Sequence, residues 1–64
     1  MDYPVVYTIT AESDTRCRLY TKDSRISEKD RCVGPIVTSK LLNTMIMISS
    51  VLNDEGFAVI FEVD

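Results

Sequence analysis

The chain has 64 residues with seven basic and ten acidic side chains, no histidine and two cysteines, and its net charge is −3. A chain of this length forms one domain at most and buries only about 60% of the surface that its unfolded form exposes. We therefore expect a single small domain over residues 1–64. Without histidine, two cysteines are too few for a closed zinc site, and we predict neither a metal nor a cofactor.

The two cysteines, Cys17 and Cys32, stand 15 positions apart, and a bridge closing a loop of that size would contribute about 3 kcal/mol. The first residues show no basic start followed by an apolar segment, as a signal peptide would, and no apolar run approaches the roughly 20 residues of a membrane span. We therefore predict a cytoplasmic protein with no membrane partner, with reduced thiols and with Cys17 as a small core residue. A disulfide stays the alternative.

The basic residues are concentrated in one quarter of the chain. Six of the seven lie within residues 16–31, where three acids interleave with them: Arg16, Arg18, Lys22, Arg25, Lys29 and Arg31. A nucleic-acid partner would have to use this quarter. The alternative is a solvated hairpin end and loop of mixed charge.

The pattern of the first twenty-one residues predicts a β-hairpin. A period-two pattern rich in β-branched and aromatic side chains predicts a first strand, whose core face carries Tyr3, Val5, Tyr7 and Ile9. Residues 11–14 supply turn-forming side chains. A second alternating segment follows, with Cys17, Leu19 and Thr21 on one face and Arg16, Arg18 and Tyr20 on the other.

The middle of the chain is less regular. Residues 22–30 have no periodicity and no large apolar side chain except Ile26, so we predict a mobile loop. Residues 31–37 fit either a short extra edge strand near Val33 or a plain linker, because Gly34 and Pro35 disfavour a central strand.

A helix is predicted over the apolar segment that follows. Thr38 or Ser39 fits the N-cap, and Gly56 fits the left-handed C′ position after the last turn. At about 100° per residue a core-facing line forms, made of Leu41, Met45, Ile48 and Leu52 and widened by Leu42, Ser49 and Ile46. Met47 and Val51 lie off this line, one turn apart.

The last strand is predicted over residues 57–63, with Phe57, Val59, Phe61 and Val63 facing the core. We expect an α+β domain of the β-β-α-β type, in which one helix covers one face of a three-stranded antiparallel sheet of order 2-1-3. The opposite, open face then carries a mixture of apolar and polar side chains: Val6, Thr8, Arg16, Arg18, Tyr20, Ala58, Ile60 and Glu62.

No catalytic pattern accompanies this fold. Nucleophilic catalysis needs a nucleophile beside a base, and without histidine the base would have to be a buried carboxylate or lysine. The carboxylates of the last third of the chain lie at helix or chain ends, where they are expected to be solvent-exposed and not to act as a buried base. The two glycines of the chain are too few for a glycine-rich phosphate-binding loop. We predict that the chain is not an enzyme.

Two surfaces are predicted to bind a partner instead. The first is the open sheet face, since apolar patches rimmed by charge mark interaction sites. The second is the flank formed by Met47 and Val51, because thioether side chains adapt to irregular surfaces. The alternative for these two residues is a helix flank that the small domain covers only in part. The predicted partner-binding residues are Val6, Arg16, Arg18, Tyr20, Ile60, Met47 and Val51.

One resemblance supports this view. Pro35 and Ile36, an intervening helix, and then Gly56, Phe57 and Val59 opening the last strand resemble the layout of small phage-encoded inhibitors of host enzymes, notably the type that blocks bacterial RNA polymerase. The resemblance implies a small domain that docks stoichiometrically on a large enzyme and obstructs it, with no catalytic residue of its own.

The leading hypothesis is therefore a small viral protein that binds and modulates a larger host protein. The first alternative is a nucleic-acid-binding module, in which Tyr20 stacks on a base and the phosphates are held by Arg16, Arg18, Lys22, Arg25 and Arg31. The second is a structural homodimer in which two open sheet faces pair.

Overall fold

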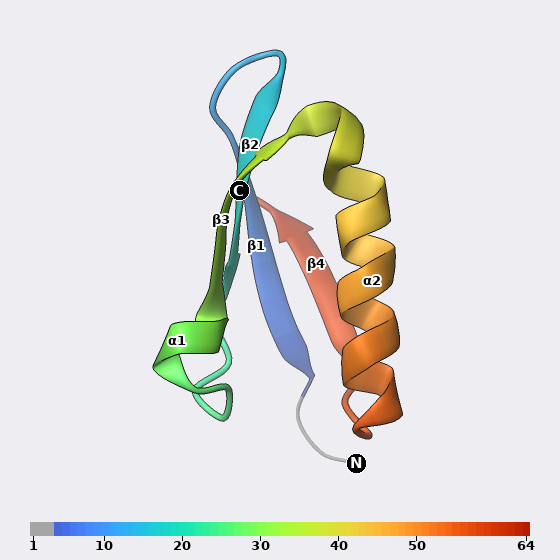
Figure 1. The fold of residues 1–64 in the computed structure, drawn as a ribbon. Helices are drawn as coiled ribbons and strands as arrows, with labels where there is room; N and C mark the ends of the chain where they lie inside the picture. The colour runs from blue at the N-terminus through green and yellow to red at the C-terminus, as the bar shows by residue number, and fades with distance from the viewer. Residues whose placement is uncertain (1–3) are drawn as a thin grey trace.

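The computed structural model describes residues 4–64, and it describes all of their side chains except those of Glu28 and Asp30. The domain is α+β, with one long helix lying along a four-stranded sheet (Figure 1). The elements in chain order are β1 (Val5–Ala11), β2 (Arg16–Thr21), α1 (Glu28–Arg31), β3 (Cys32–Val37), the 3₁₀ turn η1 (Thr38–Lys40), α2 (Leu41–Asp54) and β4 (Val59–Val63). Tyr3, predicted on the core face of the first strand, lies outside the described residues.

The sheet has the order β3-β2-β1-β4. Strand β1 is flanked by β2 and the last strand, as predicted, and the extra edge strand near Val33 exists. The prediction of a wholly antiparallel sheet is wrong, because β4 runs parallel to β1. The cause is β3, which pairs antiparallel with β2 and so reverses the chain once more before α2. The helix then returns the chain in the direction of β1.

The core lies between one face of the sheet and α2. It contains the predicted inward residues of the hairpin and two residues of the helix: Val5, Tyr7, Ile9, Cys17, Leu19, Ile48 and Leu52. Leu19 and Val5 are fully buried. Tyr7 pairs with Phe61 across β1 and β4, and their rings stack with centroids 5.7 Å apart. Because rings at this spacing interact favourably beyond their burial, the pair ties the last strand to the first.

Helix α2 ends as the sequence predicts. Gly56 has a φ of 92°, a conformation that favours glycine. Its N–H donates to the carbonyl of Asn53 at 3.0 Å, and the N–H of Phe57 donates to the carbonyl of Leu52 at 2.9 Å. These two bonds make a Schellman motif. They turn the chain directly from the helix toward β4.

The predicted N-cap is wrong. Thr38 and Ser39 lie within η1, and neither η1 nor α2 has a side-chain cap. The reason is that β3 continues to Val37 and the N–H of Thr38 donates to the carbonyl of Thr15 at 2.7 Å. The extended residue in the N-cap position of η1 is therefore Val37, whose apolar side chain cannot accept a hydrogen bond from the first free amides.

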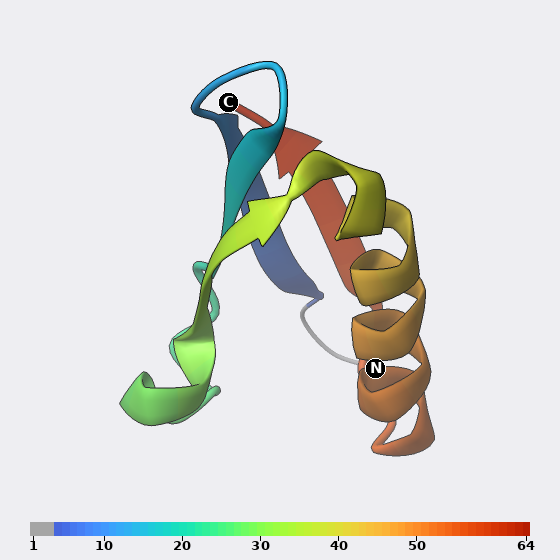
Figure 2. The ribbon, with the colours of Figure 1, turned by 45° about the horizontal axis from the view of Figure 1, so that its top comes forward.

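The core-facing line of α2 is confirmed, but its widened side is not. Ile48 and Leu52 are buried and Leu41 and Met45 are half-buried, whereas Leu42 and Ile46 are 66% and 59% exposed. The helix is inclined to the strands and lies toward β4, with β3 and α1 on the far side of the molecule (Figure 2). The sheet therefore covers only a narrow stripe of the helix.

The last strand is also less covered than expected. Phe57, Val59 and Phe61 are half-buried, but Val63 is 79% exposed. Strand β4 is an edge strand, so no neighbouring strand shields its outer side.

The segment between β2 and β3 is structured in part. It contains the single turn α1, and Ile26 packs against the core. The guanidinium Nε of Arg31 donates to the carbonyl of Ile26 at 2.8 Å. This segment therefore folds over the same face of the sheet as α2. Among residues 4–64 no helix has the length and apolar character to cross a membrane.

The two cysteines lie on different faces of the sheet. Cys17 is buried on the core face, as predicted, and Cys32 is exposed. Register explains their separation, because Cys17 pairs with Ile36 whereas Cys32 pairs with Tyr20. Both thiols are free.

Candidate functional site

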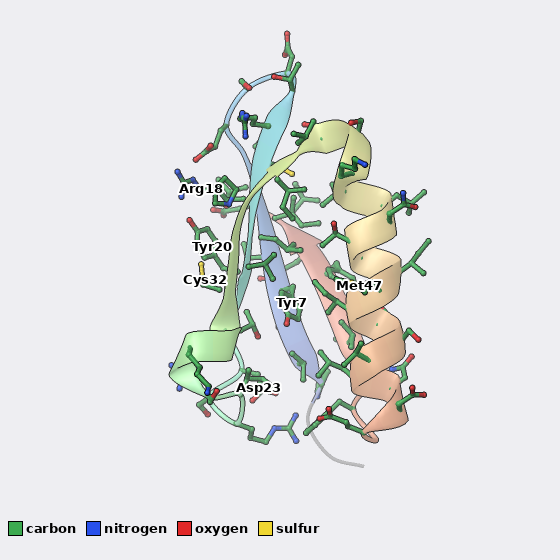
Figure 3. The ribbon with its side chains drawn as sticks, in the orientation of Figure 1. Tyr7, Arg18, Tyr20, Asp23, Cys32 and Met47 are labelled. Carbon is green, nitrogen blue, oxygen red and sulfur yellow. The ribbon has the colours of Figure 1, made fainter. Side chains whose placement is uncertain are left out.

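The predicted site residues form two separate surfaces. Five of them, Val6, Arg16, Arg18, Tyr20 and Ile60, alternate with core residues along β1, β2 and β4, so they share the face of the sheet turned away from α2. We call this the reverse face. Figure 3 shows Arg18 and Tyr20 directed away from the helix, together with Cys32, while Tyr7 and Met47 lie on the helix side.

No helix or strand of the described chain lies over the reverse face (Figures 1 and 2). The expectation of an open face therefore holds. Its apolar content is modest: Ile60 is 47% exposed and Val37 42%, while Val6 is half-buried. Thr8, in the middle of this face, is 91% buried, and its hydroxyl has no hydrogen-bond partner in the described part of the chain.

Polar side chains on the reverse face form ion pairs and hydrogen bonds with one another. Arg18 forms an ion pair with Glu12 and donates to the hydroxyl of Tyr20 at 3.2 Å. The ammonium group of Lys22 donates to Glu62 at 2.7 Å, and this bond raises the pKa of Lys22. Because these charges already have partners, a ligand must break ion pairs to use them.

The second surface is a groove on the helix side. It has a volume of about 480 Å³ and lies between α2 and the segment that follows β2. On the helix wall stand Met47 and Val51, which are 58% and 53% exposed. Ile26 and Phe57 contribute the facing apolar surface. We call this the α2 groove. Its walls bring together the two predicted flank residues with apolar residues from distant parts of the chain.

One cation stands at the α2 groove. The guanidinium of Arg25 lies over the ring of Phe57, 4.9 Å from its centroid. It also donates to the carboxylate of Asp23 at 2.7 Å, and the backbone N–H of Arg25 donates to the same carboxylate at 2.8 Å. The hydrogen bond from the Arg25 side chain lowers the pKa of Asp23. These contacts hold the loop wall of the groove in place.

The five basic residues of the nucleic-acid alternative do not form one free cationic surface. Arg18, Lys22 and Arg25 are in ion pairs with Glu12, Glu62 and Asp23, and Arg31 bonds the backbone of Ile26. Phosphate binding depends on an uncompensated positive field. The observed pairing removes much of that field.

Sequence reasoning found the helix wall of the groove but missed the opposite wall. The available signal was Ile26, the only large apolar residue within residues 22–30. A single apolar side chain in a polar loop predicts that the loop folds back onto the core, because its exposure would be unfavourable. The position of Phe57 beside the groove depends on the Schellman turn and was not predicted.

The described residues contain no group of three or more histidine, cysteine or carboxylate side chains that could hold a metal ion. Comparisons of the chain with protein-family models, with curated proteins and with solved structures found no match.

Proposed function

We propose that this protein is a small non-enzymatic binding module whose α2 groove receives an apolar side chain of a larger protein partner. The observation that supports this most is the exposure of Met47 and Val51, both more than half exposed, at the rim of a concave surface with apolar walls. Large apolar residues gathered at a groove mark binding sites more often than isolated exposed ones do.

The chemistry of the groove suits a protein rather than a small polar ligand. Methionine has three rotatable bonds and a polarisable sulfur, so Met47 can adapt to an incoming side chain. Only a few polar groups line the site, among them the Arg25 guanidinium and the Glu55 carboxylate, which can fix the direction of approach. The partner is thus expected to present a large apolar side chain flanked by polar groups.

The resemblance to phage-encoded inhibitors suggests what such binding would do. A domain of this size acts by obstruction: it occupies a surface that a bacterial enzyme needs for another contact. An interface of ordinary size, about 800 Å² per partner, would use a substantial part of its 4369 Å² of accessible surface. We propose such stoichiometric inhibition as the biological role.

Paired variants separate the two candidate surfaces. Immobilised wild-type protein is incubated with bacterial lysate beside the double variants Met47→Asp/Val51→Asp and Tyr20→Asp/Ile60→Asp, and circular dichroism confirms that each variant is folded. We expect wild type and the reverse-face variant to retain a stoichiometric protein. The groove variant should bind that protein at least tenfold more weakly, as loss of a central apolar contact does.

Two results would contradict the proposal. If both folded variants retain the partner as well as wild type does, neither surface is the site. If only the reverse-face variant loses it, binding uses the sheet and not the groove. A gel shift with single-stranded oligonucleotides at two salt concentrations tests the nucleic-acid alternative, since phosphate contacts weaken steeply as salt rises.

A further inference from the structure

We infer that a second copy of this chain binds along the outer edge of β4 and the adjoining flank of α2, giving a two-fold symmetric dimer with one continuous sheet. This surface is distinct from the α2 groove and meets the reverse face only along β4, at Ile60 and Glu62, and the inference does not depend on the proposed function.

The edge of β4 offers a row of backbone groups. The N–H of Val5 donates to the carbonyl of Ala58 at 2.7 Å, and the N–H of Asp64 donates to the carbonyl of Ile9 at 2.9 Å. Backbone groups alternate in direction along a strand, so the intervening N–H and C=O groups of Val59, Phe61 and Val63 point away from β1. No strand pairs with that side of β4 in the described part of the chain.

The two edges of the sheet differ. Strand β3 carries Pro35, contains an irregularity in its pairing with β2 and is preceded directly by α1. Proline and irregular pairing are devices that keep an edge from recruiting another strand. Strand β4, with the sequence VIFEV, has no proline and no lysine. Only β4 is suited to extend the sheet.

Apolar side chains border this edge. Ile60 is 47% exposed on the reverse face, and Val63 is 79% exposed on the core face. Leu42 and Ile46 are 66% and 59% exposed on α2. Around the helix these two lie on the opposite side of the core-facing line from Met47, which borders the groove. Their flank therefore faces away from the groove and toward the β4 side of the molecule.

A second copy matches this surface in hydrogen bonding and in charge. Antiparallel pairing of two β4 strands about Phe61 sets Val59 opposite Val63 of the other copy and satisfies the outward groups of both strands. Glu62 then faces Ile60, so no two carboxylates of the strands are opposed. The same symmetry makes the two α2 helices antiparallel. Lys40, at the start of one helix, then lies toward Asp54, at the end of the other, and these opposite charges attract.

One long side of the molecule is of the same order of area as a stable interface. The molecule measures 36 × 19 × 19 Å, so one long side has a planar area of roughly 680 Å², close to the accessible area of about 800 Å² per partner that stable interfaces bury. An isologous interface requires the same patch on both copies. A patch that joins a bare strand edge to an apolar helix flank meets that requirement.

The test compares two double variants that place equal charge on opposite flanks of α2. Sedimentation equilibrium is run on the full chain, on Leu42→Glu/Ile46→Glu and on the control Met47→Glu/Val51→Glu. We expect wild type and the control to be dimers of twice 7.3 kDa with dissociation constants within about threefold of each other. The Leu42→Glu/Ile46→Glu dimer would bury four like charges, so its dissociation constant should be about 100-fold higher than that of wild type.

Amide hydrogen exchange reports on the strand pairing itself. In the dimer the N–H groups of Val59, Phe61 and Val63 should exchange at least tenfold more slowly than in the monomeric Leu42→Glu/Ile46→Glu variant. The inference is overturned if the wild-type chain stays a monomer at 100 µM, or if both double variants weaken association equally. A dimer whose β4 amides are unprotected overturns it too, because such a dimer pairs elsewhere, for example through the reverse faces. Because the groove variant serves as the control, failure of this inference leaves the proposed function untouched.

Discussion

Leu19 offers the sharpest test of the core. Its side chain is fully buried in β2, and it pairs with Ile9 of β1 on one side and with Gly34 of β3 on the other. Truncating a buried leucine to alanine costs about 2–5 kcal/mol through lost burial and the cavity left behind. Because this core is a single thin layer that can partly collapse, we expect Leu19→Ala to cost about 3 kcal/mol.

That loss is large for a chain of this size. At the usual 0.05–0.15 kcal/mol per residue, a domain of 64 residues has a free energy of unfolding of roughly 3–10 kcal/mol. With a urea dependence of about 1 kcal/mol per M for a small domain, the midpoint of unfolding should fall by about 3 M. Circular dichroism at 222 nm follows the transition through α2, at low micromolar protein concentration so that association contributes little.

Leu42→Ala is the matched control, because it makes the same chemical change at a side chain that is 66% exposed. Alanine is also a good helix former, so this variant should stay within about 0.5 kcal/mol of wild type. Equal losses for the two variants, or a loss below about 1 kcal/mol for Leu19→Ala, would refute the assignment of the core to this face of the sheet.

Three further predictions concern the turn after α2, an ion pair and the thiols. Gly56→Ala should lower the free energy of unfolding by roughly 1–2 kcal/mol in a thermal melt, because a side chain there is strained at a φ of 92°. Asp23 has a lowered pKa in the fold because Arg25 donates to it, so its contribution to stability is present above the ordinary value of 3.8 and is lost as the pH falls through the folded value; Asp23→Asn should flatten acid unfolding curves in that range. A maleimide should label the exposed Cys32 in the native protein, whereas the buried Cys17 should react only on unfolding.

Each of these has its own control. Gly56→Asn should cost less than Gly56→Ala, since asparagine tolerates the left-handed region, and equal costs would argue against strain as the cause. Asp14→Asn in the exposed hairpin turn should leave the acid unfolding curve unchanged. Rapid labelling of both thiols in the native protein, seen by mass spectrometry, would contradict the burial of Cys17.

The sequence predicts the local parts of this fold because their signals are local. Alternation of Val5, Tyr7 and Ile9 with more polar residues predicts the strand and its inner face. The burial of all three side chains confirms that face. Gly56 marks the end of α2 for an equally local reason, since few other residues adopt its backbone conformation. These features depend on neighbours within a few positions.

The direction of β4 could not be predicted in this way. It depends on whether residues 32–37 form a strand, because each additional strand reverses the chain. Gly34 and Pro35 made that segment ambiguous, yet β3 tolerates both at the sheet edge. A single undecided segment thus changed the sheet from antiparallel to mixed.

In the candidate site, too, features set by local sequence were predictable and features set by long-range contacts were not. The off-line position of Met47 and Val51 follows from helical periodicity, and the structure leaves both side chains more than half exposed. The exposure of Leu42 and Ile46 does not follow from it, because periodicity gives the side of a helix that faces inward but not how far the sheet extends beneath it. The loop wall of the α2 groove required the fold-back of Ile26, a long-range contact.

The pairing of β1 with β4 has a consequence for folding during synthesis of the protein. Forty-seven residues, 12–58, separate these two parallel neighbours, and at about 5–20 residues per second a ribosome needs roughly 2–9 s to make them. During that interval Val5, Tyr7 and Ile9 lack the strand that closes one side of their hydrogen-bonding ladder. The nascent polypeptide therefore cannot complete its sheet before β4 has been synthesised, and the rate of elongation sets how long the apolar side chains of β1 remain accessible to chaperones and proteases.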